Sequence, residues 1–124
     1  MVTVLVTGSR SWRNKELVLD RLDQLAGTSE RLTVVHGACP QGVDSFVDNW
    51  LRLAPPWVQV RRFPADPAKG RRGFFLRNYH MVHSLIYDLC LAFIRDASRG
   101  ATMTMEMASR IEVPVDCYRE WSNR

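Results

Sequence analysis

The sequence predicts one three-layer α/β domain with a mainly parallel sheet of about five strands. Short apolar strand patterns and longer helical patterns alternate along all 124 residues. Such alternation favours right-handed crossovers, which make the strands parallel. With 46% hydrophobic residues, a chain of this length can bury a core without metal or disulfide support. We therefore expect residues 1–124 to form a single domain.

The first half of the chain contains two strand patterns and two helix patterns. Each β-branched run ends at a glycine, as expected where a buried strand opens into a turn. Gly27 follows the first helical pattern as a candidate C-cap, and Pro55-Pro56 ends the second. These patterns predict strands over 2–6 and 32–36, and helices over 14–26 and 43–51.

The second half continues this alternation after a longer irregular segment. The predicted elements are strands over 57–63, 88–94 and 113–118, and helices over 74–85 and 101–110. The segment 64–73 has two prolines, two glycines and no apolar period, which predicts a loop. We expect this loop to be a mobile lid in which Arg71 and Arg72 contact an anionic ligand, although a plain solvated connection is an alternative.

The positive charge is concentrated in one part of the chain. The net charge is +4, and residues 61–77 contain six basic residues and one acidic residue. This window therefore carries +5 and the rest of the chain −1, which favours one anion-binding face. Only Lys15 and Lys69 are lysines, and guanidinium groups suit bidentate contact with phosphate.

Cysteine usage and hydropathy indicate a cytoplasmic protein. Cys39, Cys90 and Cys117 are an odd number at no metal-ligand spacing, so we expect neither a disulfide framework nor a metal site. No apolar run approaches the ~20 residues that cross a bilayer. No basic segment precedes the first strand, so no export signal is predicted.

Small and polar residues cluster where the predicted strands end, and open α/β sheets bind ligands at that edge. Glycine turns there can direct backbone N–H groups at an oxyanion. Turns of this kind also favour such residues for backbone reasons alone. His36 and Cys39 are a poor nucleophile pair, because no third group orients them. The candidate ligand-binding residues are Thr7, Gly8, Ser9, Arg10, His36, Gly37, Ala38, Gly42, Asp44, Arg77, Asn78, Ser98, Arg99, Gly100, Ala101 and Thr102.

Together these motifs resemble the SLOG superfamily, and more closely its small stand-alone YpsA-related branch. The resemblance is carried by 4–10, 34–38, 42–44, 70–73 with Arg77, Asn78 and Met81, and 98–102. It implies a Rossmann-like domain that binds a nucleotide or a nucleotide-derived ligand. Relatives include cytokinin-activating phosphoribohydrolases and DNA-processing proteins.

The candidate catalytic residues are Arg77 and Glu106, and the second departs from the family pattern. In the phosphoribohydrolases an arginine is paired with a glutamate just after a Gly-Gly-x-Gly-Thr turn, a position that falls here at Met103 or Thr104. Glu106 comes two or three residues later, on a different side of the helix. N-glycosidic hydrolysis needs a carboxylate in the site. We therefore favour ligand binding over catalysis, with no cofactor.

Two other functions and one assembly remain open from the sequence. A nucleoside-monophosphate phosphoribohydrolase is the first alternative. The second is single-stranded nucleic-acid binding along 61–77, although the apolar patterns favour core positions for the aromatic residues. A homodimer is expected on a helix face that could instead be core, and no membrane partner is expected. The aromatic residues are Trp57, Phe63, Phe74 and Phe75, and the helix face carries Met81, Leu85 and Ile86.

Overall fold

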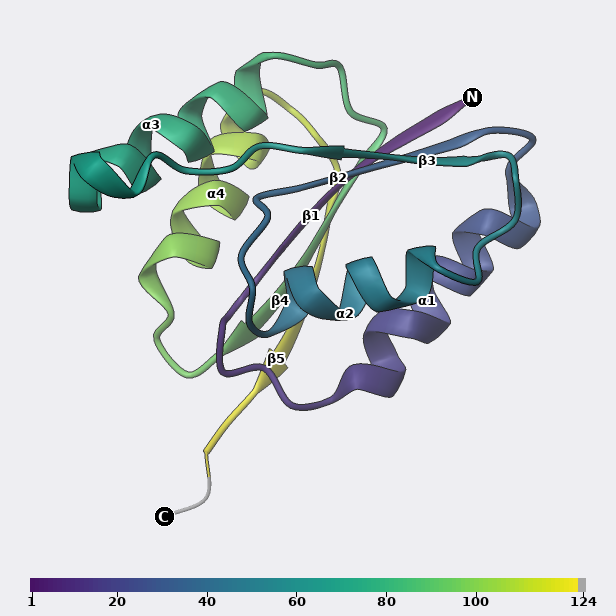
Figure 1. The fold of residues 1–124 in the computed structure, drawn as a ribbon, viewed down its shortest axis with the longest axis horizontal. Coiled ribbons are helices and arrows are strands. Elements are labelled where there is room, and N and C mark those ends of the chain that lie inside the picture. Colours follow the sequence, from purple (N-terminus) through teal and green to yellow (C-terminus); the bar gives the residue numbers. More distant parts are fainter. Residues whose placement is uncertain (123–124) are drawn as a thin grey trace.

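The computed structural model describes residues 1–122 and confirms the alternating α/β architecture (Figure 1). In chain order the elements are β1 (Val2–Gly8), α1 (Lys15–Thr28), β2 (Leu32–His36), α2 (Val43–Leu51), β3 (Val58–Arg62), a 3-10 helix η1 (Pro67–Lys69), α3 (Gly70–His83), β4 (Leu89–Arg95), α4 (Arg99–Arg110) and β5 (Val115–Glu120).

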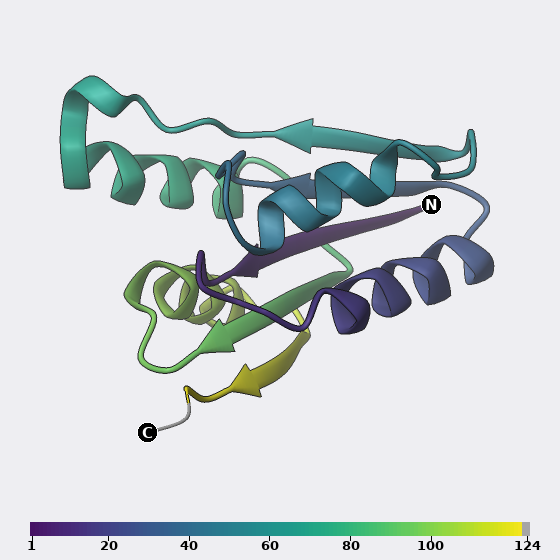
Figure 2. The same cartoon turned by 60° about the horizontal axis from the view of Figure 1, so that its bottom comes forward.

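All five strands form one parallel sheet in the order β3-β2-β1-β4-β5. Val4 of the central strand pairs with Val34 on one side and Leu89 on the other. The chain builds outward from β1 to β3, and then crosses to the far side of β1 for β4 and β5 (Figure 2). Strand order therefore reverses between β1 and β4, the position where open α/β sheets bind ligands.

Helices cover both faces of the sheet and give the three predicted layers. Successive side chains of a strand point to opposite faces. Val4 and Val6 accordingly belong to the core under α1 and α2, whereas Leu5 belongs to the core under α3 and α4. The central strand is thus buried on both sides, which explains why Val4, Leu5 and Val6 are apolar in succession.

The prediction of a loop over 64–73 holds for residues 64–66 and is wrong from residue 67, where η1 begins and leads directly into α3. Asp66 caps η1 by accepting a hydrogen bond from the backbone N–H of Ala68 at 3.0 Å. Pro67 takes the first position of η1, where its missing N–H is not needed. Gly73, which was counted as a loop residue, lies inside α3, and a Cβ at this position would be 2.6 Å from the Asp66 carbonyl oxygen. Its glycine therefore serves close packing.

Several side chains also differ from their expected environments. Trp57, Phe74 and Phe75 are exposed, so their prediction as core residues is wrong, whereas Phe63 packs against the core. Met81 is buried in the core and Leu85 packs against it, while Ile86 is exposed. The face suggested for a dimer is therefore mostly part of the core.

Other differences concern the ends of elements. The helix α1 continues past Gly27 to Thr28, whose hydroxyl donates a hydrogen bond to the Gln24 carbonyl oxygen at 2.9 Å. The last strand is shifted along the chain to Val115–Glu120, which places Glu120 at the carboxyl edge of the sheet. Within residues 1–122, none of the helices has the length and apolar character required to cross a membrane.

Candidate functional site

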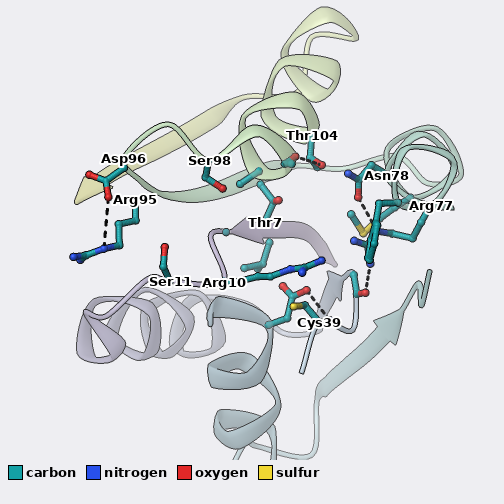
Figure 3. A pocket seen from close by; sticks show the side chains of 18 of the residues that line it. Thr7, Arg10, Ser11, Cys39, Arg77, Asn78, Arg95, Asp96, Ser98 and Thr104 are labelled. Atoms are coloured by element: carbon teal, nitrogen blue, oxygen red, sulfur yellow. Dashed lines mark hydrogen bonds and ion pairs between the residues drawn. The ribbon is translucent and has the colours of Figure 1, made fainter. Parts of the chain in front are cut away.

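A cavity of 540 Å³ lies at the carboxyl edge of the sheet, at the point of strand reversal (Figure 3). Its walls come from the ends of β1 and β4, the turns that follow β1, β2 and β4, and the inner faces of α3 and α4. Segments distant in sequence therefore meet at the edge that the strand-end motifs indicated.

Two glycines allow the β1 and β2 turns to approach each other. A Cβ on Gly8 would lie 2.5 Å from the Cβ of Val43, so glycine is needed for α2 to pack against β1. Gly42 has a φ of +69°, and a Cβ on it would lie 2.6 Å from the Cα of Arg10. The backbone after β1 thus crosses directly over the residue that precedes α2, and Arg10 and Ser11 in this crossing line the cavity.

Arg77 reaches from α3 to the end of β2. Its Nη1 donates to the carbonyl oxygens of Gly37 and Phe63, the second at 3.3 Å, and its Nε donates to Asn78 Oδ1 at 2.7 Å. A Cβ on Gly37 would lie 2.5 Å from Nη1, so this approach requires glycine. Burial lowers the pKa of Arg77, and Arg10 lowers it further, although Asp44 and Cys39 oppose the shift. A second cation beside a partly buried guanidinium favours an anion.

Arg10 is the second cation of the cavity. Its guanidinium carbon lies 5.0 Å from the centroid of the Phe74 ring, and that of Arg77 lies 5.7 Å from the same ring. Figure 3 shows Arg10 extending across the cavity toward Arg77. Phe74 and two arginines therefore line one side of the cavity.

Asp44 is a buried carboxyl group that also lines the cavity. Its Oδ2 accepts a hydrogen bond from the backbone N–H of Cys39 at 3.0 Å and lies 4.0 Å from His36 Nδ1. Burial raises the pKa of Asp44, and the opposing effects of His36, the Cys39 N–H and Arg77 do not cancel this rise. The cavity therefore contains a carboxyl group that ionises less readily than usual.

His36 is fully buried and belongs to the framework rather than to the cavity wall. Its Nδ1 accepts the backbone N–H of Ala38 at 2.9 Å, so the ring proton lies on Nε2, 2.9 Å from Asp48 Oδ1. Burial opposes ionisation of Asp48, but hydrogen bonds from Arg62 and His36 outweigh it and lower the pKa of Asp48. With both nitrogens engaged, His36 does not act as a base for Cys39.

The β4–α4 turn forms the opposite wall. Ser98 is the N-cap residue of α4, and its side chain makes no capping hydrogen bond. Gly100, Ala101 and Thr104 lie on the side of α4 that faces the cavity. The first N–H groups of a helix have no partner within it, and the turn that carries them here is part of the cavity wall.

Ser9 and Arg95 fasten the strands at the point of reversal. The backbone N–H of Ser9 donates to the Phe93 carbonyl oxygen at 2.9 Å, and the Ser9 hydroxyl accepts the backbone N–H of Arg95 at 2.8 Å. The Arg95 guanidinium forms an ion pair with Glu120. Glu120 also accepts the backbone N–H groups of Arg13 and Asn14. Although burial acts against it, these contacts lower the pKa of Glu120.

The structure brings ten of the predicted ligand-binding residues into the cavity wall and leaves the others outside it. Those in the wall are Thr7, Gly8, Arg10, Gly37, Asp44, Arg77, Asn78, Ser98, Gly100 and Ala101. Four of the others support the wall from behind, namely Ser9, His36, Ala38 and Gly42. Two are exposed in the first turn of α3, namely Arg71 and Arg72. The last two, Arg99 and Thr102, lie on the other side of α4.

Several wall residues were absent from the prediction. Thr104 lies on the same helical face as Gly100 and Ala101, because it follows them by four and three residues, and this spacing could have predicted it from the sequence. Arg95 is the last residue of β4 and Asp96 follows it, whereas the apolar pattern ended the predicted strand at residue 94. The other wall residues outside the prediction are Val6, Ser11, Cys39, Phe74, Met81 and Ala97.

The candidate catalytic residues do not share the cavity. Arg77 lines it, whereas Glu106 is exposed on another side of α4, 3.9 Å from Arg110. Among residues 1–122, the carboxyl groups that line the cavity belong to Asp44 and Asp96.

Comparison with known sequences gives two matches. The profile of the YspA, cpYpsA-related SLOG family matches residues 2–70. The Gene 61 protein of Mycobacterium phage D29 is 36% identical over 120 residues, which cover 93% of this chain and 94% of the phage protein. No solved structure matches the chain. The profile match includes the β1 and β2 turns but ends where α3 begins.

Proposed function

The chain belongs to the YspA, cpYpsA-related SLOG family, and from this premise we propose that it binds a nucleotide or nucleotide-derived ligand in the cavity at the carboxyl edge of its sheet. A sensor or sequestering role follows from binding without chemical conversion. A homodimer formed by two copies is part of the same proposal.

The excess positive charge of the cavity is the observation that carries this proposal. Arg10 and Arg77 both line the cavity, and within residues 1–122 neither forms an ion pair with a carboxylate. The nearby Asp44 accepts a hydrogen bond from the backbone N–H of Cys39 and lies 4.0 Å from His36 Nδ1, and it forms an ion pair with neither arginine. Two guanidinium groups in a partly enclosed site favour phosphate, which they can contact by charge-assisted hydrogen bonds.

The cavity also suits the rest of a nucleotide. Its volume of 540 Å³ lies within the ~300–1,000 Å³ typical of small-molecule sites. Phe74 and Met81 supply apolar surface beside polar groups from Thr7 and Asn78. A flat base can contact the apolar surface while the polar groups hydrogen-bond to its edge or to a sugar.

Thermal-shift measurements test this proposal. Nucleoside monophosphates, ADP-ribose, NAD and cyclic nucleotides are the probes, and a ligand at 100 times its Kd should add about 2.7 kcal/mol to the free energy of unfolding. Arg10→Ala should weaken binding at least tenfold, about 1.4 kcal/mol. Arg52→Ala is the control, because Arg52 is exposed at the far end of α2. If none of these probes raises the melting temperature, the proposal is wrong.

A phosphoribohydrolase is a second candidate because Asp44 places a carboxyl group in the same cavity as Arg77. Such an enzyme would release a free base and ribose 5-phosphate, with a carboxylate stabilising the developing positive charge on the sugar. Chromatography of common nucleoside monophosphates after incubation would detect the base. Turnover that Asp44→Asn abolishes and Glu106→Gln leaves intact would favour this function.

Single-stranded nucleic-acid binding is a third candidate, favoured by exposed residues of α3. Arg71, Arg72, Phe75 and Tyr79 all lie on the surface there, and cations beside aromatic rings suit an unpaired strand. Because counterions are released, this binding should fall by orders of magnitude between low and moderate salt. Binding of a monophosphate in the cavity should weaken far less.

A further inference from the structure

The first turns of α4 separate two hollows. Gly100, Ala101 and Thr104 face the cavity already described, whereas Arg99, Met103 and Glu106 face a second hollow of 550 Å³. Asp96, Ala97 and Ser98 line both. The two hollows therefore meet over the β4–α4 turn.

An exposed indole forms the far wall of the second hollow. Trp121 follows β5, lines the hollow and is 65% exposed. The next residue, Ser122, donates its backbone N–H to Asp96 Oδ1 at 2.9 Å, which ties this segment to the β4–α4 turn. The segment is thus anchored beside the turn that separates the hollows.

The charges of the second hollow suit an anion. Arg99 and Arg119 are exposed, and both line it. The two carboxylates of this hollow, Asp96 and Glu106, lie 3.9 Å from Arg95 and from Arg110, respectively, whereas Arg99 and Arg119 form no ion pair within residues 1–122. Of the three residues that line both hollows and form the ridge between them, Ala97 and Ser98 have small side chains, and the Asp96 carboxylate accepts the backbone N–H of Ser122. A phosphate linkage can therefore cross this ridge close to the start of α4.

We propose that the ligand is a two-base nucleotide, in which one nucleoside occupies the main cavity and the second occupies the hollow formed by Trp121, Arg119 and the outer side of α4. This inference rests on the proposed function. An aromatic base gains by stacking on an exposed indole, and the linking phosphates would lie between Arg99 and the cavity arginines. A ligand with one base would leave the second hollow to solvent.

Calorimetric titration of the full chain tests the proposal. The one-base probes are AMP and GMP, and the two-base probes are P1,P2-diadenosine diphosphate and P1,P2-diguanosine diphosphate. For the base that the cavity accepts, the two-base probe should bind at least tenfold more tightly, about 1.4 kcal/mol. Trp121→Ala should remove this gain and leave the one-base affinity unchanged, whereas Trp121→Phe should retain most of it.

Trp57→Ala is the matched control, because Trp57 is another exposed tryptophan and precedes β3 at the opposite edge of the sheet. It should change neither affinity. Equal affinities for the one-base and two-base probes, or a gain that survives Trp121→Ala, would overturn the inference while leaving the proposed function intact. No binding of any of the four probes would overturn the inference and would count against the proposed function itself.

Discussion

The β2–α2 turn and the β4–α4 turn both follow buried strands and both line the cavity, but they use their polar groups differently. In the first, His36, Asp44 and the Gly37 carbonyl each have a partner within the protein. In the second, Ser98 caps nothing with its side chain and Gly100 is exposed. The comparison indicates that internal hydrogen bonds hold the first turn in shape, whereas the second turn is the one that we propose contacts the ligand.

The largest effect on the free energy of unfolding should come from replacing a glycine in one of these two turns by alanine. Gly42→Ala should lower the free energy of unfolding by about 3–4 kcal/mol, because a positive φ and the close Arg10 backbone both oppose a Cβ. A Cβ on Gly100 would have no heavy atom within 4 Å. Gly100→Ala should therefore leave stability unchanged or slightly higher, while reducing nucleotide affinity about fivefold, about 1 kcal/mol.

Urea denaturation and calorimetry measure these two quantities separately. Gly27→Ala is the control for helix propensity, because Gly27 lies in α1 with open space around its Cα. Equal losses of stability in Gly42→Ala and Gly100→Ala would contradict the division between the two turns.

His36→Ala should have the next largest effect, a loss of about 2–3 kcal/mol in the free energy of unfolding. The substitution opens a cavity beneath the turn and removes the partners of the Ala38 N–H and of Asp48. The midpoint of urea unfolding is the measurement. A variant as stable as the wild type would show that the turn does not depend on this network.

Two helix N-caps should differ in their contribution to the free energy of unfolding by up to about 1 kcal/mol. Asn14 caps α1 by accepting the Leu17 N–H at 3.2 Å, so Asn14→Ala should cost about 1 kcal/mol of stability. Ser98→Ala should cost less than about 0.5 kcal/mol, because its side chain caps nothing. Thermal unfolding of both variants at one pH is sufficient. A larger loss in Ser98→Ala would assign the hydroxyl a structural role.

The effect of Asp44→Asn on the free energy of unfolding should depend on pH. Burial raises the pKa of Asp44 above its ordinary value of 3.8. The resulting stabilisation is present below that value and is lost as the pH rises through the folded-state pKa. The amide side chain of the variant does not ionise, so its stability relative to the wild type should increase from about pH 4 to pH 7. Urea unfolding across this range checks the sign, and a difference independent of pH would contradict it.

The elements were predictable from sequence wherever burial alone determines the pattern. The β-branched run of 2–6 and the helical spacing of the apolar residues in 43–51 correspond to β1 and α2. Residues 67–73 were misjudged because glycine and proline signal loops statistically, whereas Gly73 is required by a contact with Asp66. That contact belongs to the tertiary structure of this segment and leaves no local pattern.

The cavity was predictable to the extent that its residues sit on strand ends. Thr7, Gly37 and Ser98 were found for that reason, because parallel strands place their carboxyl ends at one edge. Arg71 and Arg72 were included for their charge, but the early start of α3 leaves them exposed outside the wall. Which charged side chains enter a cavity depends on helix phase, and the irregular approach to α3 concealed that phase.

The contacts of Glu120 with Arg13, Asn14 and Arg95 have a practical consequence for handling the protein. Glu120 holds the backbone after β1, and Trp121 and Ser122 follow it at the cavity edge of the sheet. Met1 precedes β1 at the opposite edge and is exposed (Figure 1). The chain that continues beyond Ser122 leaves the described structure at the cavity edge, so an affinity tag or sensor-chip linker on that side starts near the two hollows, whereas one joined before Met1 starts away from them. Immobilisation through the amino terminus should therefore leave both hollows open to solution.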